Sequence, residues 1–198
     1  MRSVTGLLLC GAIVVGLWQS RAAAAISASV SYTSQQLNSN TYQYALTLQN
    51  TSTAGEPIGT FWFAWIPQSV FGYPYDFLPH LPTGVSSPTG WTGAPLVDGI
   101  APPSGGGTIE WYDTGTPLPA GQSLTGFSFM SSDPPSAIAG TSFFDGYPVA
   151  TSWVYMGALQ SGGNPSDQGA QLTATQSVPE PAFCLPMAGV LLLAFRRR

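Results

Sequence analysis

Positive charge is almost absent from this chain. It has no lysine, and its five arginines all lie near the two ends, at Arg2, Arg21, Arg196, Arg197 and Arg198. The segment 26–177 has eight acidic residues and no cation, so its formal charge is about −8 with histidine neutral. A nucleic-acid partner requires Lys or Arg to displace the counterions on its phosphates, and an anionic membrane surface requires them too. We therefore predict no nucleic-acid partner, and membrane contact only through the terminal segments.

Cysteine is equally scarce. Cys10 and Cys184 both lie in terminal hydrophobic runs, so segment 26–177 has no disulfide and no cysteine-based metal site. His80 is the only histidine, and one histidine without cysteine does not make a zinc site. We predict no metal and no cofactor. The same segment has five Trp, eight Tyr and eight Phe, whose burial can stabilise a core without cross-links.

The first 25 residues have the three parts of a secretory signal peptide. Arg2 gives a positive start, Leu7 to Trp18 form an apolar run, and the alanines from Ala22 to Ala25 suit signal peptidase. We predict cleavage after Ala25. An uncleaved anchor is the alternative, but the 12-residue run rises only about 18 Å as a helix against a hydrocarbon core of about 30 Å.

The last 21 residues also have three parts in order. The motif Val178, Pro179, Glu180, Pro181 precedes an apolar stretch from Ala182 to Phe195, and the chain ends on Arg196, Arg197 and Arg198. This order resembles the PEP-CTERM sorting signal, in which a Pro-Glu-Pro motif, a hydrophobic helix and a basic cluster are recognised by an exosortase, a membrane-embedded processing enzyme. The resemblance covers residues 178–198 and departs from a regular helix at Pro186. It implies an exosortase as a partner.

Physical chemistry favours the same interpretation of the tail. The prolines around Glu180 disfavour helix, and the arginines stay cytoplasmic by the positive-inside rule. A 14-residue apolar helix spans only about 21 Å, which suits a transient anchor better than a permanent one. An ordinary tail anchor is the alternative. We predict an exported protein at the cell envelope surface or outside the cell.

Segment 26–159 has the pattern of an all-β domain. In Thr41 to Asn50, apolar and polar residues alternate with a period of two, and Ile58 to Ile66 is apolar on both faces, as in a central strand. Further strands are expected at Ala28 to Thr33, Thr108 to Tyr112, Ser123 to Met130 and Val149 to Met156. The 15 prolines between Ile26 and Ser177 oppose long helices. We predict an antiparallel β-sandwich, immunoglobulin-like or jelly-roll in outline, flanked by a signal helix and a sorting helix.

Two segments of the middle region have no clear period. Phe71 to Pro103 has seven prolines and is expected to be an ordered loop on the sandwich. Gln160 to Ser177 is rich in Gly, Ser, Gln and Thr, which predicts a flexible linker. The predicted order is a signal peptide at 1–25, the sandwich at 26–159, the linker at 160–177 and the sorting signal at 178–198.

Catalytic patterns are weak. Asp113-Thr114-Gly115 resembles the loop of aspartic proteases, but those enzymes use two such carboxylates and this chain has one copy. His80 is the only candidate base for a serine hydrolase, and Glu56 with Glu110 could form a glycosidase pair only if the fold brought them together. Asn50-Thr51-Ser52 has the form of a glycosylation sequon.

Three functions follow from these features. The first is a non-enzymatic surface or extracellular-matrix protein, sorted through its tail. The second is a secreted carbohydrate-binding module, with extracellular polysaccharide as its partner and Trp62, Trp91 and Trp111 as candidate sugar-stacking residues. The third is a hydrolase that uses carboxylates. A row of exposed aromatic side chains would favour the second, and two acids converging in a cleft would favour the third.

Overall fold

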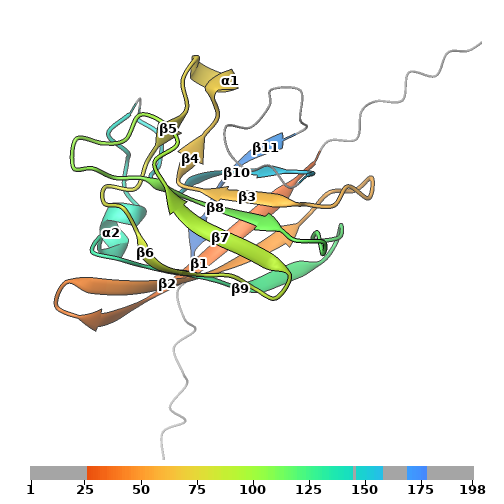
Figure 1. Cartoon of the computed structure of the whole chain (residues 1–198), viewed down its shortest axis with the longest axis horizontal. Helices are drawn as coiled ribbons and strands as arrows, with labels where there is room; N and C mark the ends of the chain where they lie inside the picture. The colour runs from red at the N-terminus through yellow and green to blue at the C-terminus, as the bar shows by residue number, and fades with distance from the viewer. Residues whose placement is uncertain (1–25, 145, 158–168, 178–198) are drawn as a thin grey trace, which may run out of the picture.

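The computed structural model describes residues 26–144, 146–157 and 169–177. Two five-stranded sheets pack face to face as an all-β sandwich, which confirms the predicted fold class (Figure 1). The predicted signal helix and sorting helix lie outside the described residues. Within the described ranges, every helix is too short or too polar to cross a membrane.

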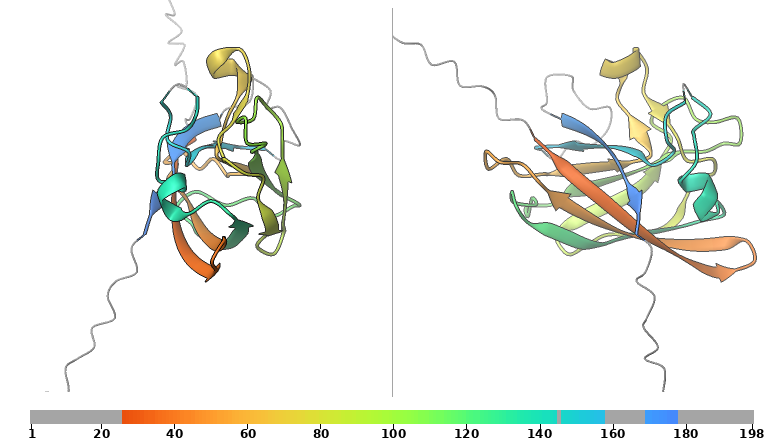
Figure 2. Two further views of the ribbon diagram at one scale, coloured as in Figure 1. Left: turned by 90° about the vertical axis from the view of Figure 1, so that its left-hand side faces the viewer. Right: turned by 180° about the vertical axis from the view of Figure 1, so that it is seen from behind.

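The first sheet has the strand order β12-β1-β2-β9-β6. Its strands are β1 (Ala28–Asn38), β2 (Thr41–Asn50), β6 (Thr83–Ser86), β9 (Ser123–Ser131) and β12 (Thr175–Gln176). All its pairs are antiparallel except β1 with β12, which run parallel. The β1–β2 hairpin extends beyond the rest of the sandwich (Figures 1 and 2).

The second sheet has the order β11-β10-β3-β8-β7, with every pair antiparallel. Its strands are β3 (Thr60–Phe63), β7 (Trp91–Leu96), β8 (Thr108–Asp113), β10 (Thr151–Tyr155) and β11 (Gly169–Thr173). A small pair, β4 (Trp65–Ile66) with β5 (Tyr75–Asp76), and two single-turn helices, α1 (Gln68–Phe71) and α2 (Pro135–Ile138), complete the fold.

The alternation in β2 explains how the first sheet meets the core. Tyr44, Leu46 and Leu48 are buried while Gln43 and Gln49 are exposed, as a half-buried strand requires. On β9 a bulge opposite Leu46 and Thr47 leaves Gly126 as the extra residue, at φ +100°. The bulge changes the alternation, so that Leu124 and Phe127, three residues apart, both pack on the core.

The predicted central strand from Ile58 to Ile66 is interrupted at Ala64. This residue has φ 58°, in the left-handed region that a non-glycine residue rarely adopts. Its carbonyl accepts a hydrogen bond from the Phe77 backbone N–H at 2.9 Å. The turn ends β3 and starts β4, so Trp65 joins Trp62 on the outer face of the second sheet instead of joining Phe61 in the main core.

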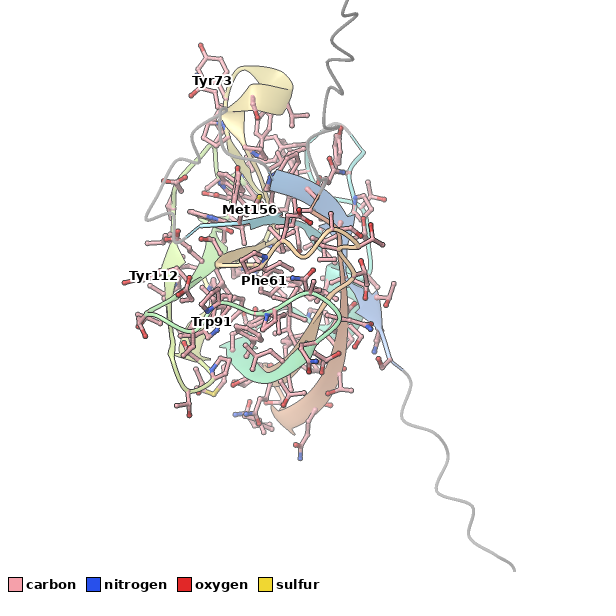
Figure 3. All side chains as sticks on the ribbon, turned by 90° about the vertical axis from the view of Figure 1, so that its right-hand side faces the viewer. Phe61, Tyr73, Trp91, Tyr112 and Met156 are labelled. Carbon is pink, nitrogen blue, oxygen red and sulfur yellow. The ribbon has the colours of Figure 1, made fainter. Side chains whose placement is uncertain are left out.

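Beyond Ala64 the chain builds a third, smaller layer. Segments 65–78 and 97–107, named the outer layer here, are joined by bridges between Tyr75 and Ile100 and between Leu78 and Gly107. Figure 3 shows Phe61 and Trp91 inside the molecule, while Tyr73 lies at the outermost tip beside α1. The prediction of one ordered loop over 71–103 is therefore incomplete, because β5, β6 and β7 form within it.

The predicted linker at 160–177 is wrong for its last nine residues. β11 pairs with β10 along its whole length, and β12 pairs with β1 at Ser31 and Tyr32. The Ser177 N–H donates to the Tyr32 carbonyl at 2.8 Å. Ala170 and Leu172 pack on the main core, which explains why a polar segment still forms a strand. The sandwich therefore extends to the end of the described chain.

Candidate functional site

Three tryptophans were the candidate sugar-stacking residues, and the structure corrects all three. Trp62 and Trp111 are 0% exposed and Trp91 is 6% exposed. Trp111 and Trp91 face between the sheets, where their indole N–H groups donate to the Ser86 and Thr116 carbonyls at 3.0 and 3.1 Å. Trp62 is covered by Trp65. Rings enclosed in this way have no free face for a sugar.

Trp62 and Trp65 belong to a buried cluster on the outer face of the second sheet. Their rings stack with centroids 4.3 Å apart, and Tyr155 packs against them. Cross-strand pairing places Glu110 opposite Trp62, and Asp76 opposite Trp65. Because directly paired residues of antiparallel strands share a face, both carboxyl groups lie beside indole rings.

Burial changes the acidity of both carboxyl groups. Loss of solvation, with a smaller contribution from the charge of Asp98, raises the pKa of Glu110 from 4.5 to about 8. Loss of solvation also raises the pKa of Asp76 from 3.8 to about 6, although the backbone N–H groups of Asp98 and Gly99 donate to its Oδ2 at 3.1 Å each and oppose the shift. Glu110 Oε1 has no hydrogen-bond partner among the described residues. Glu110 is therefore mostly protonated at neutral pH.

His80 pairs with a buried carboxylate. Its Nδ1 lies 2.5 Å from Asp133 Oδ1, with the His80 side chain 55% exposed and the Asp133 side chain 2% exposed. Asp133 Oδ2 also accepts the Ser131 hydroxyl at 3.0 Å and the His80 backbone N–H at 3.2 Å. Ser131 thus donates to the acid and not to the histidine, whereas a serine nucleophile must contact its base.

The other catalytic candidates remain separate. Asp113 Oδ1 accepts the Gly115 N–H at 2.8 Å, so Asp113-Thr114-Gly115 forms a local turn. The carboxylate beside Glu110 is Asp98, and Glu56 lies instead in the loop after β2. No group of three His, Cys, Asp or Glu side chains in the described segments could hold a metal ion.

An open pocket lies between the outer layer and the segment around α2. Its volume is about 570 Å³, within the range of about 300–1,000 Å³ common for small-molecule sites. Apolar side chains form most of its wall: Phe77, Pro79, Pro102, Pro103, Phe143 and Val149. We name it the Phe143 pocket, because the Phe143 side chain is 71% exposed at its edge.

The walls of the Phe143 pocket are held by hydrogen bonds. The Ser104 hydroxyl donates to the Pro79 carbonyl and joins the two segments of one wall. On the other wall, the Val149 N–H donates to the Gly140 carbonyl at 3.0 Å, and Thr141 forms a bridge with Pro148. The pocket is therefore part of the folded structure.

Comparison with known proteins gives no family. No protein-family model matches the chain, and no curated protein matches its sequence. Among solved structures, a GH20 exo-β-N-acetylglucosaminidase from Vibrio harveyi is 12% identical with a TM-score of 0.39 as an inactive mutant, and 10% identical with a TM-score of 0.38 in complex with N-acetylglucosamine. Each match covers 76% of this chain and 18% of the enzyme chain.

A third similar structure is a CBM3 of Hungateiclostridium clariflavum. It is 13% identical with a TM-score of 0.31, over 71% of this chain and 99% of that one. Identities and TM-scores this low carry no argument about function.

Sequence reasoning missed the Phe143 pocket entirely. Its walls come from segments around residues 77, 103 and 140, which meet only after folding. The one local sign was the pair Phe143-Phe144 within a stretch rich in Gly, Ser and Pro. The predicted sorting residues and cleavage residue, from Val178 onward and at Ala25, lie outside the described residues.

Proposed function

We propose that this protein is an exported, non-enzymatic protein of the bacterial cell surface or extracellular matrix, processed at both ends and sorted through its tail. One observation carries the proposal. The first strand of the sandwich starts at Ala28 and the last ends at Gln176, while the expected cuts lie after Ala25 and near Pro179 to Pro181. Both cuts would leave every described strand in place.

The distribution of charge supports the same proposal. All five arginines lie outside segment 26–177, at the two ends that export and sorting would use. A body with eight acids and no cation suits a neutral partner such as an uncharged extracellular polysaccharide, since it would repel anionic surfaces. Signal peptidase and exosortase would be the processing enzymes, and the C-terminal segment a transient membrane anchor.

Intact-mass and terminal-peptide mass spectrometry of the protein from its native bacterium tests the proposal. We expect a mature N-terminus at Ile26 and a C-terminus that lacks Arg196, Arg197 and Arg198. Replacing Glu180 with alanine should leave the N-terminal cut unchanged and block the C-terminal one. Recovery of the uncut chain from the cytosol would refute the proposal.

A carboxylate hydrolase is the second candidate, favoured by Glu110 and Asp98. A proton-bearing carboxyl group beside a second acid is the pairing that glycoside hydrolysis uses. Glu110, however, is only 5% exposed. Reducing-sugar release from neutral and anionic polysaccharides, compared between the native chain and Glu110→Gln, decides between the two. Release that is lost in the variant would establish the hydrolase, and no release from any substrate would exclude it.

A further inference from the structure

The Phe143 pocket combines apolar walls with hydroxyl groups and has no charged group in its lining. None of its described lining residues is ionisable. Ser136 and Thr141 add exposed hydroxyl groups to the wall that bears Phe143. Hydroxyl groups both donate and accept hydrogen bonds, so they match a ligand that does the same. This chemistry suits an uncharged ligand with one apolar face and a hydroxylated edge.

Phe143 is exposed but contacts a neighbouring aromatic ring. Its ring meets Phe144 edge to face, with centroids 5.3 Å apart and an interplanar angle of 90°. Phe144 in turn stacks on Tyr75 at 4.7 Å and packs near Phe77 at 6.4 Å. The series connects Phe143 through Phe144 to the buried Phe77, and most of the Phe143 side chain is left open to a ligand.

We propose that the Phe143 pocket binds a pyranose ring of a neutral polysaccharide. The C–H face of the sugar would stack on Phe143 and the proline rings, and its hydroxyl groups would bond to Ser136 and Thr141. The inference deepens the proposed function, because it names the site and the ligand class for the extracellular polymer. In this inference, residues of the Phe143 pocket contact the sugar in place of the buried Trp62, Trp91 and Trp111.

The charge of the body decides which saccharides fit. Segment 26–177 has eight acidic residues, of which Glu110 is mostly protonated, and no cation, so an alginate or polygalacturonate chain would be repelled. The exposed rim, which includes Pro103, Ser104 and Phe143, would leave a long acyl chain partly in water. A neutral sugar has no charge to desolvate and no long apolar chain to bury, so neither cost applies to it in such an open pocket.

The test is calorimetric titration of the full chain, purified in a non-glycosidic detergent, with four probes: cellohexaose, xylohexaose, maltohexaose and oligogalacturonate. We expect binding of at least one neutral hexamer and none of oligogalacturonate. Phe143→Ala should weaken that binding by about tenfold or more. Thr141→Val, which keeps the side-chain shape and removes the hydroxyl, should weaken it by a smaller factor.

Tyr73→Ala is the matched control, because Tyr73 is also exposed, at 63%, but lies at the tip of the outer layer and outside the pocket lining. It should leave the affinity within about twofold. Unfolding curves of both variants show that they remain folded. Absence of binding by all three neutral hexamers at about 10 mM overturns the inference, as does equal weakening by Tyr73→Ala and Phe143→Ala. If both terminal cuts are found but no sugar binds, the inference fails and the proposed function stands.

Discussion

Glu110 should make the stability of this protein fall as the pH rises. Its carboxyl group is buried beside Trp62, and burial raises its pKa from 4.5 to about 8. A raised pKa in the folded state means that the folded chain holds a proton that the unfolded chain has released. Stability is therefore greatest below pH 4.5 and decreases as the pH approaches the folded pKa of about 8.

The size of the effect follows from the two pKa values. Between pH 5 and pH 8, a carboxyl group whose pKa is raised from 4.5 to about 8 lowers the free energy of unfolding by on the order of 3 to 4 kcal/mol. Asp76, whose pKa is raised from 3.8 to about 6 mainly by burial, adds on the order of 1 kcal/mol over the same interval. Glu110→Gln removes the first contribution and leaves the second. The variant should thus lose less stability than the native chain, by on the order of 3 to 4 kcal/mol.

Urea unfolding at several pH values, followed by tryptophan fluorescence, measures this difference. The four fully or nearly buried tryptophans Trp62, Trp65, Trp91 and Trp111 report the transition. Asp113→Asn is the control, since it removes a negative charge from the half-buried end of the same strand, β8. If Glu110→Gln and the native chain lose the same stability between pH 5 and pH 8, the account of Glu110 is wrong.

Three further substitutions test the packing, each by the urea midpoint. Gly93→Ala would place a Cβ 2.1 Å from Trp111 Cδ1 and should cost about 2 kcal/mol or more, whereas Gly157→Ala, with nothing within 4 Å, should cost less than about 1 kcal/mol. Ala64→Val puts a β-branched residue at φ 58° and should cost about 2 kcal/mol or more; a smaller loss than for Ala64→Gly would contradict this. Asn50→Asp removes the buried donors to the Glu56 and Leu118 carbonyls, at 2.7 and 3.0 Å, and should cost about 2–4 kcal/mol. The same burial predicts an unglycosylated Asn50, which peptide mapping checks.

The alternation of apolar and polar residues predicted the long strands of the first sheet. Thr41 to Asn50 forms β2 with the expected bounds, because its alternation is the direct trace of one buried and one exposed face. Ile58 to Ile66 was predicted as a central strand, and β3 does lie in the middle of its sheet. The change of face at Ala64 had no sign in the sequence, because alanine does not mark a positive φ as glycine does.

The strands that the sequence did not predict lie at the edges of the sheets. β7 contains Gly93 and Pro95, which weaken a strand pattern but are tolerated at the edge of a sheet. β11 has only Ala170 and Leu172 on its inner side, too few for a clear period. The Phe143 pocket could not be predicted for a different reason. Its three wall segments are brought together by the outer layer, and the position of that layer depends on the turn at Ala64.

The loss of stability with rising pH should begin in the outer layer. A strand that is apolar on both faces must be buried on both. The outer layer buries the second face of β3, because Trp65 stacks on Trp62. Glu110 and Asp76 lie at this contact, so ionising them should loosen the layer before the sandwich opens. We expect the amides of Phe77 and Leu78, bonded to the Ala64 and Gly107 carbonyls, to lose exchange protection between pH 5 and pH 8 by at least about tenfold more than those of β2, after correction for intrinsic rates. Equal losses in the two regions would mean that the carboxyl groups act on the whole fold rather than on the layer.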